Sequence, residues 1–478
     1  MSEPVFRLNR RAFLGRYAGG LGSLALPYLL ARSASAAEPA PARSAGVLAT
    51  RKPVHAPRAT AVISLFQHGG PSHMDLFDPK PELSKRNGQP HPGQLEVHFD
   101  KQKGSLLGSP FRFLRHGRCG MELSELLPQM GSIADDITLV RSMTTDSVDH
   151  EAALRCIHTG KVLAGRPGWG AWVIYGLGTE RADLPAYVVL SDPGGLPVDG
   201  IRNWSSGFLP AVYQGTRIRA TGPPVFNLHP PESLPAAERA RQLRLIGDLN
   251  RAHLSSFAGG PESAELEARI TNFETAASMQ LSVTDALDVS KESAATRALY
   301  GLDAKPTQEY GRRCLMARRL VEAGVRFVQI FLSGQPWDTH SKNAATLKGL
   351  CAMSDGPSAA LVKDLKDRGL LDSTIVLWTG EFGRLPISQG TDGRDHNRHA
   401  FSLWLAGGGF RAGYVHGATD ELGYKSVESV VHVSDLHATL LHCLGLDHKR
   451  LTYDHEGRED SLTDIAVTSA RVRPELLV

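Results

Sequence analysis

One pattern recurs along the chain and constrains its fold: a run of apolar and β-branched residues is followed at once by a polar loop. The runs are ATAVISLFQ at 59–67, VRFVQIFL at 325–332 and STIVLWT at 373–379. Helical spacing precedes two of them, in GRRCLMARRLVEAG at 311–324 and SAALVKDLKDRG at 358–369. Buried strands joined by helices predict an α/β fold with a mostly parallel central sheet.

The loops that follow these strands hold polar residues suited to a functional site. In parallel sheets, ligands bind beyond the carboxyl ends of the strands. A further loop, TDGRDHNRHAF at 391–401, adds Asp395, His396 and His399 before another apolar run. The residues that follow the three strands are His68, His73, Asp75, Asp338, His340, Glu381 and Arg384.

This combination of histidines and carboxylates predicts a metal site. Neutral imidazoles and carboxylates are preferred ligands of zinc, manganese and iron where thiolates are lacking. The five cysteines show no CxxC spacing, so they are interpreted as mostly buried thiols. A single histidine is more often a packing residue than a ligand. Several loops that each contain histidines or carboxylates, however, favour a two-metal hydrolytic site.

The amino terminus has the layout of an export signal. NRRAFLG at 9–15 pairs two arginines with Phe and Leu, and a short apolar stretch and small residues follow, which predicts a twin-arginine signal over 1–36. The stretch is too short and too interrupted to predict a membrane span in the mature chain; a retained anchor is the alternative. Residues 37–58, rich in Ala, Pro and Arg, are expected to be a linker.

The mature chain offers no feature of a nucleic-acid-binding protein. Removing 1–36 takes away five arginines and one glutamate, so the formal charge of +3 falls to about −1. No basic block with interleaved aromatic residues occurs, which argues against nucleic acid as a partner. A prefolded, exported protein is expected in the periplasm or outside the cell.

An ordered series of motifs resembles the DUF1501 family. The motifs are HGGPSHMDLFDPKP, VRSMTTDSVDHEAALRCIHTG, WDTH, TGEFGR, DHNRHAF, DLHATLLHCLGL and GREDSLTDI. That family is similar to the sulfatase-like branch of the alkaline phosphatase superfamily. The resemblance implies a three-layer α/β/α sandwich over 59–470, and helical, charged stretches predict a helical insertion or cap at about 200–300.

The resemblance also implies metal ligands. Asp75 is nearest to the metal-binding Asp of the superfamily's first strand, with His68 or His73 as substitutes. Glu381 takes the place of the Asp in a late Asp-His-Gly turn, whose His is replaced here by Phe382. The remaining implied ligands are Asp338, His340 and His396, for zinc first, with manganese, iron or calcium as alternatives.

Three residues are the candidates for catalysis. His150 falls where the resemblance places the nucleophile, and Thr144, Thr145 and Ser147 lie just upstream. His150 or His399 is a candidate acid for the leaving group. Arg384 is a candidate fork for the oxygens of a phosphate or sulfate, with a structural ion pair as the alternative.

Two functions remain open at this stage. The first is an exported metal-dependent hydrolase of phosphate or sulfate esters, with glycans among the candidate substrates. The second is a non-catalytic binding or assembly protein that keeps the same fold, which Phe382 and the unclear nucleophile favour. Redox chemistry has no supporting motif in the sequence.

Overall fold

The centre of the protein is one large, twisted sheet. The computed structural model describes residues 48–181, 183–220, 235–256 and 262–478, so the expected signal segment and the first part of the linker lie outside the described residues. The sheet has nine strands, with β16 pairing beside β5. In spatial order its strands are β13 (Tyr414–His416), β5 (Ile137–Thr144), β12 (Phe401–Ala406), β9 (Thr374–Thr379), β1 (Ala61–Phe66), β8 (Phe327–Ile330), β6 (Tyr187–Ser191) and β7 (Thr216–Arg219), with β16 (Val431–His432) off this path.

Most neighbouring strands in this sheet run parallel. β1 lies between β8 and β9 and is parallel to both, and β6 is parallel to β7 and β8. β12 alone runs against its neighbours, β5 and β9. The three sequence runs predicted to be strands therefore form the middle of the sheet, and their carboxyl ends meet at one edge.

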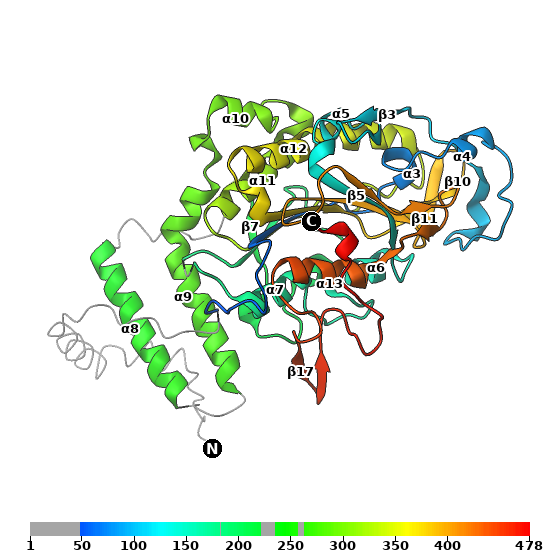
Figure 1. Ribbon diagram of the computed structural model, residues 1–478. Coiled ribbons are helices and arrows are strands. Elements are labelled where there is room, and N and C mark those ends of the chain that lie inside the picture. The colour runs from blue at the N-terminus through cyan, green and yellow to red at the C-terminus, as the bar shows by residue number, and fades with distance from the viewer. Residues whose placement is uncertain (1–47, 182, 221–234, 257–261) are drawn as a thin grey trace, which may run out of the picture. The chain divides into compact units, whose positions relative to one another are not determined.

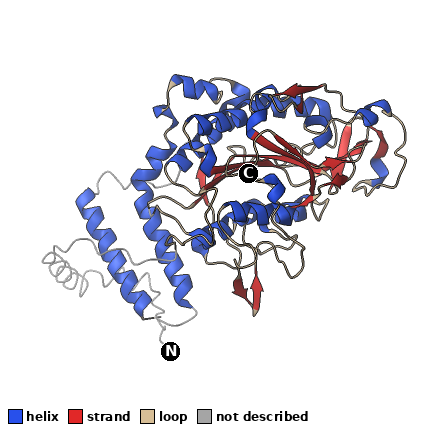
Figure 2. Ribbon diagram, viewed as in Figure 1, coloured by secondary structure: helices blue, strands red, loops and turns tan. Residues whose placement is uncertain are grey.

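Helices cover both faces of the sheet, which gives three layers (Figures 1 and 2). Side chains alternate along β1, so Ile63 and Leu65 join one buried cluster while Val62 and Phe66 join the other. The predicted α/β/α sandwich is confirmed. The first cluster includes α11 (Lys305–Glu322) and α12 (Asn343–Asp367), and the second includes α6 (His150–Thr159), α7 (Trp169–Leu177) and α13 (Val433–Cys443).

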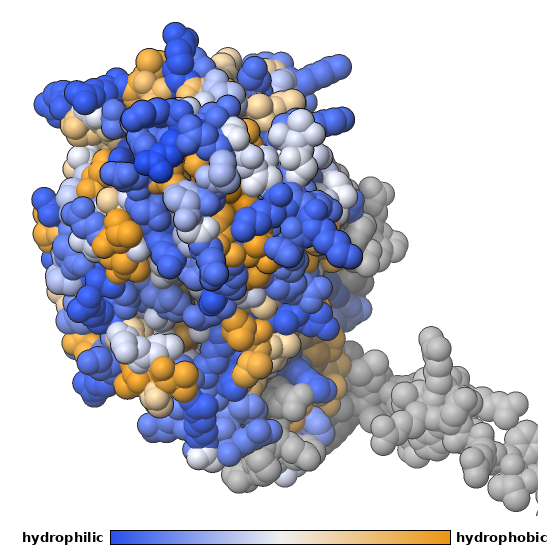
Figure 3. Space-filling model, turned by 90° about the vertical axis from the view of Figure 1, so that its right-hand side faces the viewer, coloured by the Kyte–Doolittle hydropathy of each residue, from blue (hydrophilic) through white to orange (hydrophobic). Residues whose placement is uncertain are grey.

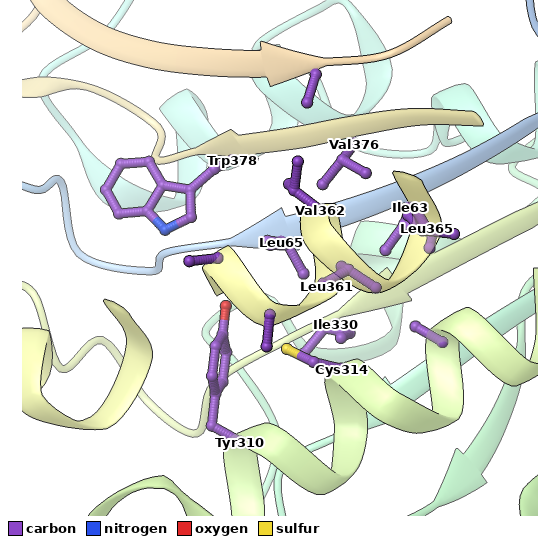
Figure 4. Packing of buried hydrophobic residues seen from close by; sticks show 14 of the residues in the cluster. Ile63, Leu65, Tyr310, Cys314, Ile330, Leu361, Val362, Leu365, Val376 and Trp378 are labelled. Carbon is purple, nitrogen blue, oxygen red and sulfur yellow. The ribbon is translucent and has the colours of Figure 1, made fainter. Parts of the chain in front are cut away.

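The layer of α11 and α12 packs directly on the three central strands. Figure 4 shows Leu361, Val362 and Leu365 of α12 against strand residues that include Ile63 and Val376. All five side chains are fully buried. Truncating one such leucine to alanine typically costs about 2–5 kcal/mol of stability, so this packing holds the strand ends that carry the site.

A small antiparallel sheet stands beside the carboxyl ends of the central strands. It consists of β2 (Lys103–Leu106), β10 (Gly383–Gln389) and β11 (Gly393–Asn397), with β10 in the middle. The sequence prediction of loops at 380–384 and 391–401 is therefore wrong in part. Arg384 is the second residue of β10, and His396 lies on β11 directly opposite Arg384.

The part of the chain at about 200–300, where a helical insertion is expected, contains a strand as well as helices. Its first part contains a short 3-10 turn and β7, which extends the central sheet. The long helices are α8 (Ala236–Ser255) and α9 (Glu262–Leu287), and α9 contacts α8 and α11.

The remaining elements are short and lie between the main layers or at the surface. They are α3 (His73–Leu76), α4 (Pro81–Lys85), α5 (Pro128–Gly131), α10 (Ala294–Leu299), and the hairpins β3 (Phe113–His116) with β4 (Met121–Ser124), β14 (Ala418–Thr419) with β15 (Ser426–Glu428) and β17 (Tyr453–His455) with β18 (Arg458–Asp460). In the described part of the chain, no helix is both long enough and apolar enough to cross a membrane.

Candidate metal centre

Five elements deliver side chains to one point at the edge of the central sheet. His68 follows β1, Asp338 and His340 follow β8, and Glu381 follows β9. The other contributions come from the first residue of α6 and from β11. Residues far apart in the sequence meet here because the carboxyl ends of parallel neighbours lie side by side. The two remaining residues are His150 and His396.

The centre of this cluster is one oxygen of Asp338. Its Oδ1 lies 3.0 Å from Nε2 of His340, 3.2 Å from Nε2 of His396 and 3.3 Å from Nε2 of His150. The ligand atoms of these four residues all lie within 4.8 Å of one another. His396 and Asp338 are 3% and 12% exposed at their side chains, so the cluster is largely shielded from water.

The other ring nitrogen of each histidine is held by an oxygen acceptor. An oxygen that can only accept requires a proton on Nδ1, so the Nε2 of a neutral ring would turn its lone pair toward Asp338. The Nδ1 partners are Glu381 Oε1 for His150 at 2.7 Å, the side-chain oxygen of Gln389 for His340, and the carbonyl oxygen of Val148 for His396 at 2.6 Å.

This arrangement fits a divalent cation. Three imidazole Nε2 atoms and a carboxylate oxygen converge, and each neutral ring could offer a lone pair to a cation placed among them. His and carboxylate ligands are typical of zinc, manganese and iron. The second ring nitrogen of a metal-binding histidine usually donates to a carboxylate or carbonyl, as all three Nδ1 atoms do here.

The charged neighbours within the cluster shift the pKa values of its titratable groups. Burial lowers the pKa of His150, but the carboxylates of Asp338 and Glu381 outweigh burial and raise it to about 9. Burial raises the pKa of Glu381, but His150 and His68 outweigh it and lower the value to about 2. The pKa of Asp338 is far below its usual range, because its histidine neighbours and Arg384 overcome its burial. Both carboxylates are therefore charged at neutral pH.

His68 lies beside the cluster with no hydrogen bond to either ring nitrogen. It is fully buried, and burial lowers its pKa although the nearby charge of Glu381 raises it. Buried polar groups normally have a partner, so an unpaired imidazole next to a buried carboxylate indicates a place for a further ligand or ion. From the sequence alone, His68 is expected only as a substitute for Asp75.

Glycines allow the loops of the site to touch. Gly69 has φ +115°, and a Cβ there would lie 2.4 Å from the backbone nitrogen of Asp338. A Cβ at Gly70 would lie 2.6 Å from the ring of Phe382. The backbone N–H of Gly69 also donates to both oxygens of Glu381, at 2.9 and 3.1 Å. The HGG sequence therefore serves close loop packing and fixes Glu381.

The guanidinium of Arg384 is not free to bind an anion such as phosphate or sulfate. It is fully buried, and its Nε and Nη1 donate to the carbonyls of Gly70 and Arg394, each at 2.9 Å. Its Nη2 donates to Asp338 Oδ1 at 2.6 Å and to the carbonyl of Gly69. The guanidinium binds two loops and a strand together and orients Asp338, which is the structural alternative considered from the sequence.

Asp75 lies apart from the cluster, contrary to its expected place among the ligands. Arg394 forms a two-point ion pair with it, at 2.8 and 3.1 Å. Ser72 Oγ and Asn343 Nδ2 donate to the same carboxylate, at 2.6 and 2.9 Å. Burial raises the pKa of Asp75, but Arg394 outweighs it and lowers the value. The oxygens of Asp75 therefore already accept hydrogen bonds from Arg394, Ser72 and Asn343.

His399 also lies apart from the cluster. Its Nε2 lies 2.7 Å from Glu96 Oε2, at a position where both side chains are 30–40% exposed. The chain has left β11 by this point, so His399 and His396 diverge although they are three residues apart. Asp395 is used in another way, since its Oδ1 accepts the backbone N–H of His396 at 2.8 Å.

Some residues of the site carried no recognisable sequence signal. Gln389 and the carbonyl of Val148 hold two of the three histidines, but neither belongs to a pattern that predicts this. The same is true of His98 and Phe99, whose rings pack on His396 and His340. These contributions depend on how β10 and the segment before β2 fold against the cluster.

Fold and site together define an α/β/α protein with a histidine and carboxylate centre at the carboxyl ends of its strands. The chain belongs to the DUF1501 family, described as a protein of unknown function, which it matches over residues 59–476. The family resemblance seen in the sequence is therefore confirmed. No curated protein matches the chain.

Several solved structures of sulfatases and related proteins are similar to this chain. Ps i-CgsB is 10% identical with a TM-score of 0.37, over 82% of this chain and 73% of that one. The PsFucS1 sulfatase from Pseudoalteromonas sp. is 12% identical with a TM-score of 0.34, over 81% and 68%. A protein in the alkaline phosphatase superfamily from Vibrio parahaemolyticus is 9% identical with a TM-score of 0.34, over 88% and 74%. Likeness this distant assigns no residue of the site, so its chemistry rests on the side chains of this chain.

Proposed function

We propose that the protein is an exported metal-dependent hydrolase of phosphate or sulfate esters. One observation carries the proposal: three histidine Nε2 atoms converge on Asp338 Oδ1, and each Nδ1 is held by an oxygen. A purely structural ion pair needs only one partner for the carboxylate. Here three imidazoles converge on it, and an oxygen acceptor at Nδ1 fixes the orientation of each ring.

Zinc, manganese or iron suits this donor set better than calcium. Calcium prefers six or more oxygen ligands, and here three of the four converging atoms are imidazole nitrogens. When bound, a divalent cation supplies a water nucleophile at neutral pH and positive charge for the oxygens of the ester. Neighbouring His68 offers one further nitrogen on the side of Glu381, where a second ion of a two-metal site would bind.

The residues of the chain have separate tasks in this proposal. His150, His340, His396 and Asp338 hold the cation. Glu381 keeps the ring of His150 in place through Nδ1. Water is the proposed nucleophile, and the hydroxyl of Ser147, just upstream of His150, accepts the backbone N–H of Asp149 at the start of α6.

The remaining sequence expectations are kept as parts of the proposal. We place a twin-arginine signal at 1–36, a linker at 37–58 and the catalytic domain at 59–470, with α8 and α9 as its helical insertion. Export of a folded protein to the periplasm or beyond allows a bound cation to travel with the chain. The proposed substrate is an ester of phosphate or sulfate, including one carried by a glycan.

A non-catalytic binding protein is the second candidate, and the contacts of Arg384 favour it. Its Nε, Nη1 and Nη2 all donate to carbonyls or to Asp338, so it offers no free fork to a phosphate or sulfate. Such a protein would bind a cation for stability or for binding a partner, without hydrolysing an ester.

Metal analysis with a paired histidine control tests the proposal. The protein is purified without added metal, its metal content is measured by elemental mass spectrometry, and p-nitrophenyl phosphate and p-nitrophenyl sulfate are offered as substrates. His396→Ala is compared with His399→Ala, a histidine three residues away that lies outside the cluster. We expect metal and hydrolysis in the wild type and in His399→Ala, and loss of both in His396→Ala.

Each other outcome has a defined meaning. A folded wild type that neither holds nor rebinds zinc, manganese or iron contradicts the metal centre. Stoichiometric metal without hydrolysis of either ester, or of a wider ester panel, supports the binding protein instead.

A further inference from the structure

A segment from Glu96 to Gln102 lies against the metal-centre side of β11 and the turn that follows it. The backbone N–H groups of His98 and Phe99 both donate to Asp395 Oδ2, each at 2.9 Å. Glu96 is anchored by its backbone N–H, which donates to the hydroxyl of Tyr424 at 2.9 Å. Asp395 directly precedes His396, so the same carboxylate holds both the segment and the backbone of a cluster residue.

The anchoring sets two aromatic rings on the cluster. The ring of His98 is stacked on that of His396, with centroids 5.1 Å apart and an angle of 22°. The ring of Phe99 lies edge-on to His340, with centroids 5.2 Å apart and an angle of 87°. Each ring therefore contacts one of the three converging histidines.

Both rings face water on their other side. Phe99 is 39% exposed, and His98 is also exposed, whereas His396 is buried. Figure 1 draws this segment at the right-hand side, near β10 and β11. Figure 3 shows that side of the molecule, where hydrophobic residues occur in small groups among hydrophilic ones. An isolated exposed phenylalanine is common, but one that packs on a cluster histidine is placed where a substrate would enter.

We propose that His98 and Phe99 form the wall that receives the leaving group of the ester, and that they select leaving groups with a flat, apolar face. This inference rests on the proposed function. An ester oxygen that reaches Asp338 and its histidines brings the attached group against these two rings. Aromatic walls with a few convergent polar groups are typical of small-molecule sites, and ring stacking favours planar groups over small alkyl groups.

Binding of two phosphonates that differ only in this group tests the wall. Phenylphosphonate and methylphosphonate are titrated separately into the metal-loaded protein by calorimetry, so no turnover is needed. A hydrophobic contact of this size typically changes affinity by about tenfold or more. We expect phenylphosphonate to bind about tenfold more tightly to the wild type, and Phe99→Ala and His98→Ala each to lose most of that difference.

Phe273→Ala is the matched control. Phe273 is a phenylalanine of similar exposure, 44%, on α9 and outside the cluster, so this variant should keep the wild-type preference. Equal binding of the two phosphonates, no binding of either, or a preference that survives in Phe99→Ala would overturn the inference. Loss of metal from Phe99→Ala would also overturn it, because the ring would then be a cover for the ligands and not a wall for the substrate.

This result is separable from the proposed hydrolase activity. If the protein hydrolyses no ester but binds phenylphosphonate through Phe99, the aromatic wall is supported and the catalytic proposal is contradicted. A protein that hydrolyses esters without preference between aryl and alkyl leaving groups keeps the catalytic proposal and loses the wall.

Discussion

The two ends of α6 carry histidines in different surroundings. His150 is the first residue of the helix, and His158 lies about 12 Å further along its axis. His150 faces Asp338 and Glu381, and its pKa is raised to about 9 against the effect of burial. His158 faces no carboxylate at contact distance among the described residues, and burial lowers its pKa to about 3.

The second group consists of His158 and His437, which line one small internal cavity between the sheet and its helices. Burial lowers the pKa of His437 to about 4. His437 Nε2 donates to the carbonyl of Ile157 at 2.9 Å, and His158 Nδ1 lies 3.2 Å from the side-chain nitrogen of Gln329. One ring nitrogen of each is left without a partner. The other lining residues are Ser64, Phe66, Ile157, Trp169, Leu377, Thr379, Leu436 and Leu440.

The difference shows what separates a candidate ligand from a core residue. The second group is fully buried, and the first is largely shielded from water. Only the first has carboxylates that lie close enough to attract a cation and acceptors that turn the Nε2 atoms inward. Burial alone therefore favours neutral histidine, whereas a buried carboxylate beside several histidines favours an added positive charge.

The largest effect on metal binding is expected when the charge of Asp338 is removed. In Asp338→Asn the shape is kept, but the three imidazoles lose the anion on which they converge. We expect metal affinity to fall by about 100-fold or more, since even residues behind the ligands typically contribute 10–100-fold. Metal titration followed by elemental analysis measures this.

Asp355→Asn is the control for that prediction. Asp355 is also a buried carboxylate, whose pKa burial raises to about 6, but it accepts the backbone N–H groups of Gln129 and Met130 far from any histidine cluster. Its variant should bind metal as the wild type does. Equal losses in both variants would mean that metal affinity reports general stability.

A smaller effect is expected from Glu381→Gln. The amide oxygen can still accept from His150 Nδ1 and from Gly69, so the ring keeps its direction but loses the electrostatic support of a charge. Metal affinity should fall by about tenfold. Isothermal titration with zinc is the measurement, and an unchanged affinity would show that Glu381 only packs the loop.

The smallest effect on metal is expected in the second histidine group. His437→Gln can still donate to the carbonyl of Ile157, so metal content should stay at the wild-type level. Its effect should appear in the pH dependence of stability. The folded pKa of about 4 lies below the unfolded value of 6.5, so between these values the unfolded state binds the proton more readily.

Wild-type stability should therefore fall as the pH drops from about 6.5 to 4, by an amount on the order of 2–3 kcal/mol from this group. In His437→Gln that part of the pH dependence should disappear. Urea unfolding at pH 7, 5.5 and 4.5 provides the comparison. Parallel pH profiles for the two proteins would show that His437 titrates alike in both states.

The fold followed from the sequence more fully than the site did. The three apolar runs are the central strands because hydrophobic density and flanking helical spacing are local properties that sequence records directly. The antiparallel sheet of β2, β10 and β11 was missed because its strands are rich in polar residues such as Arg384 and His396, which face the site and do not alternate as surface strands do.

Within the site, the errors have a common cause. Asp75 and His399 are residue types that bind metals, and both lie in predicted loops beside strands. Their partners, Arg394 and Glu96, are distant in sequence, so no local pattern predicts these contacts. The outcome for each candidate residue depended on which opposite charge the tertiary fold placed beside it. Residue type and loop position therefore identify candidate ligands, but they do not predict which candidates meet in the folded protein.

The parallel pairing of β1 has a consequence for the timing of assembly. Val62 of β1 pairs with Phe327 of β8, and Ala61 pairs with Thr374 of β9. The loop that carries His68 can therefore reach its final position only after these strands, from the last third of the chain, have been synthesised. His396 must also be synthesised before the four converging residues can meet. During translation the early segments therefore cannot form the centre on their own, and occupancy of the centre would report that the chain has been synthesised at least through β11.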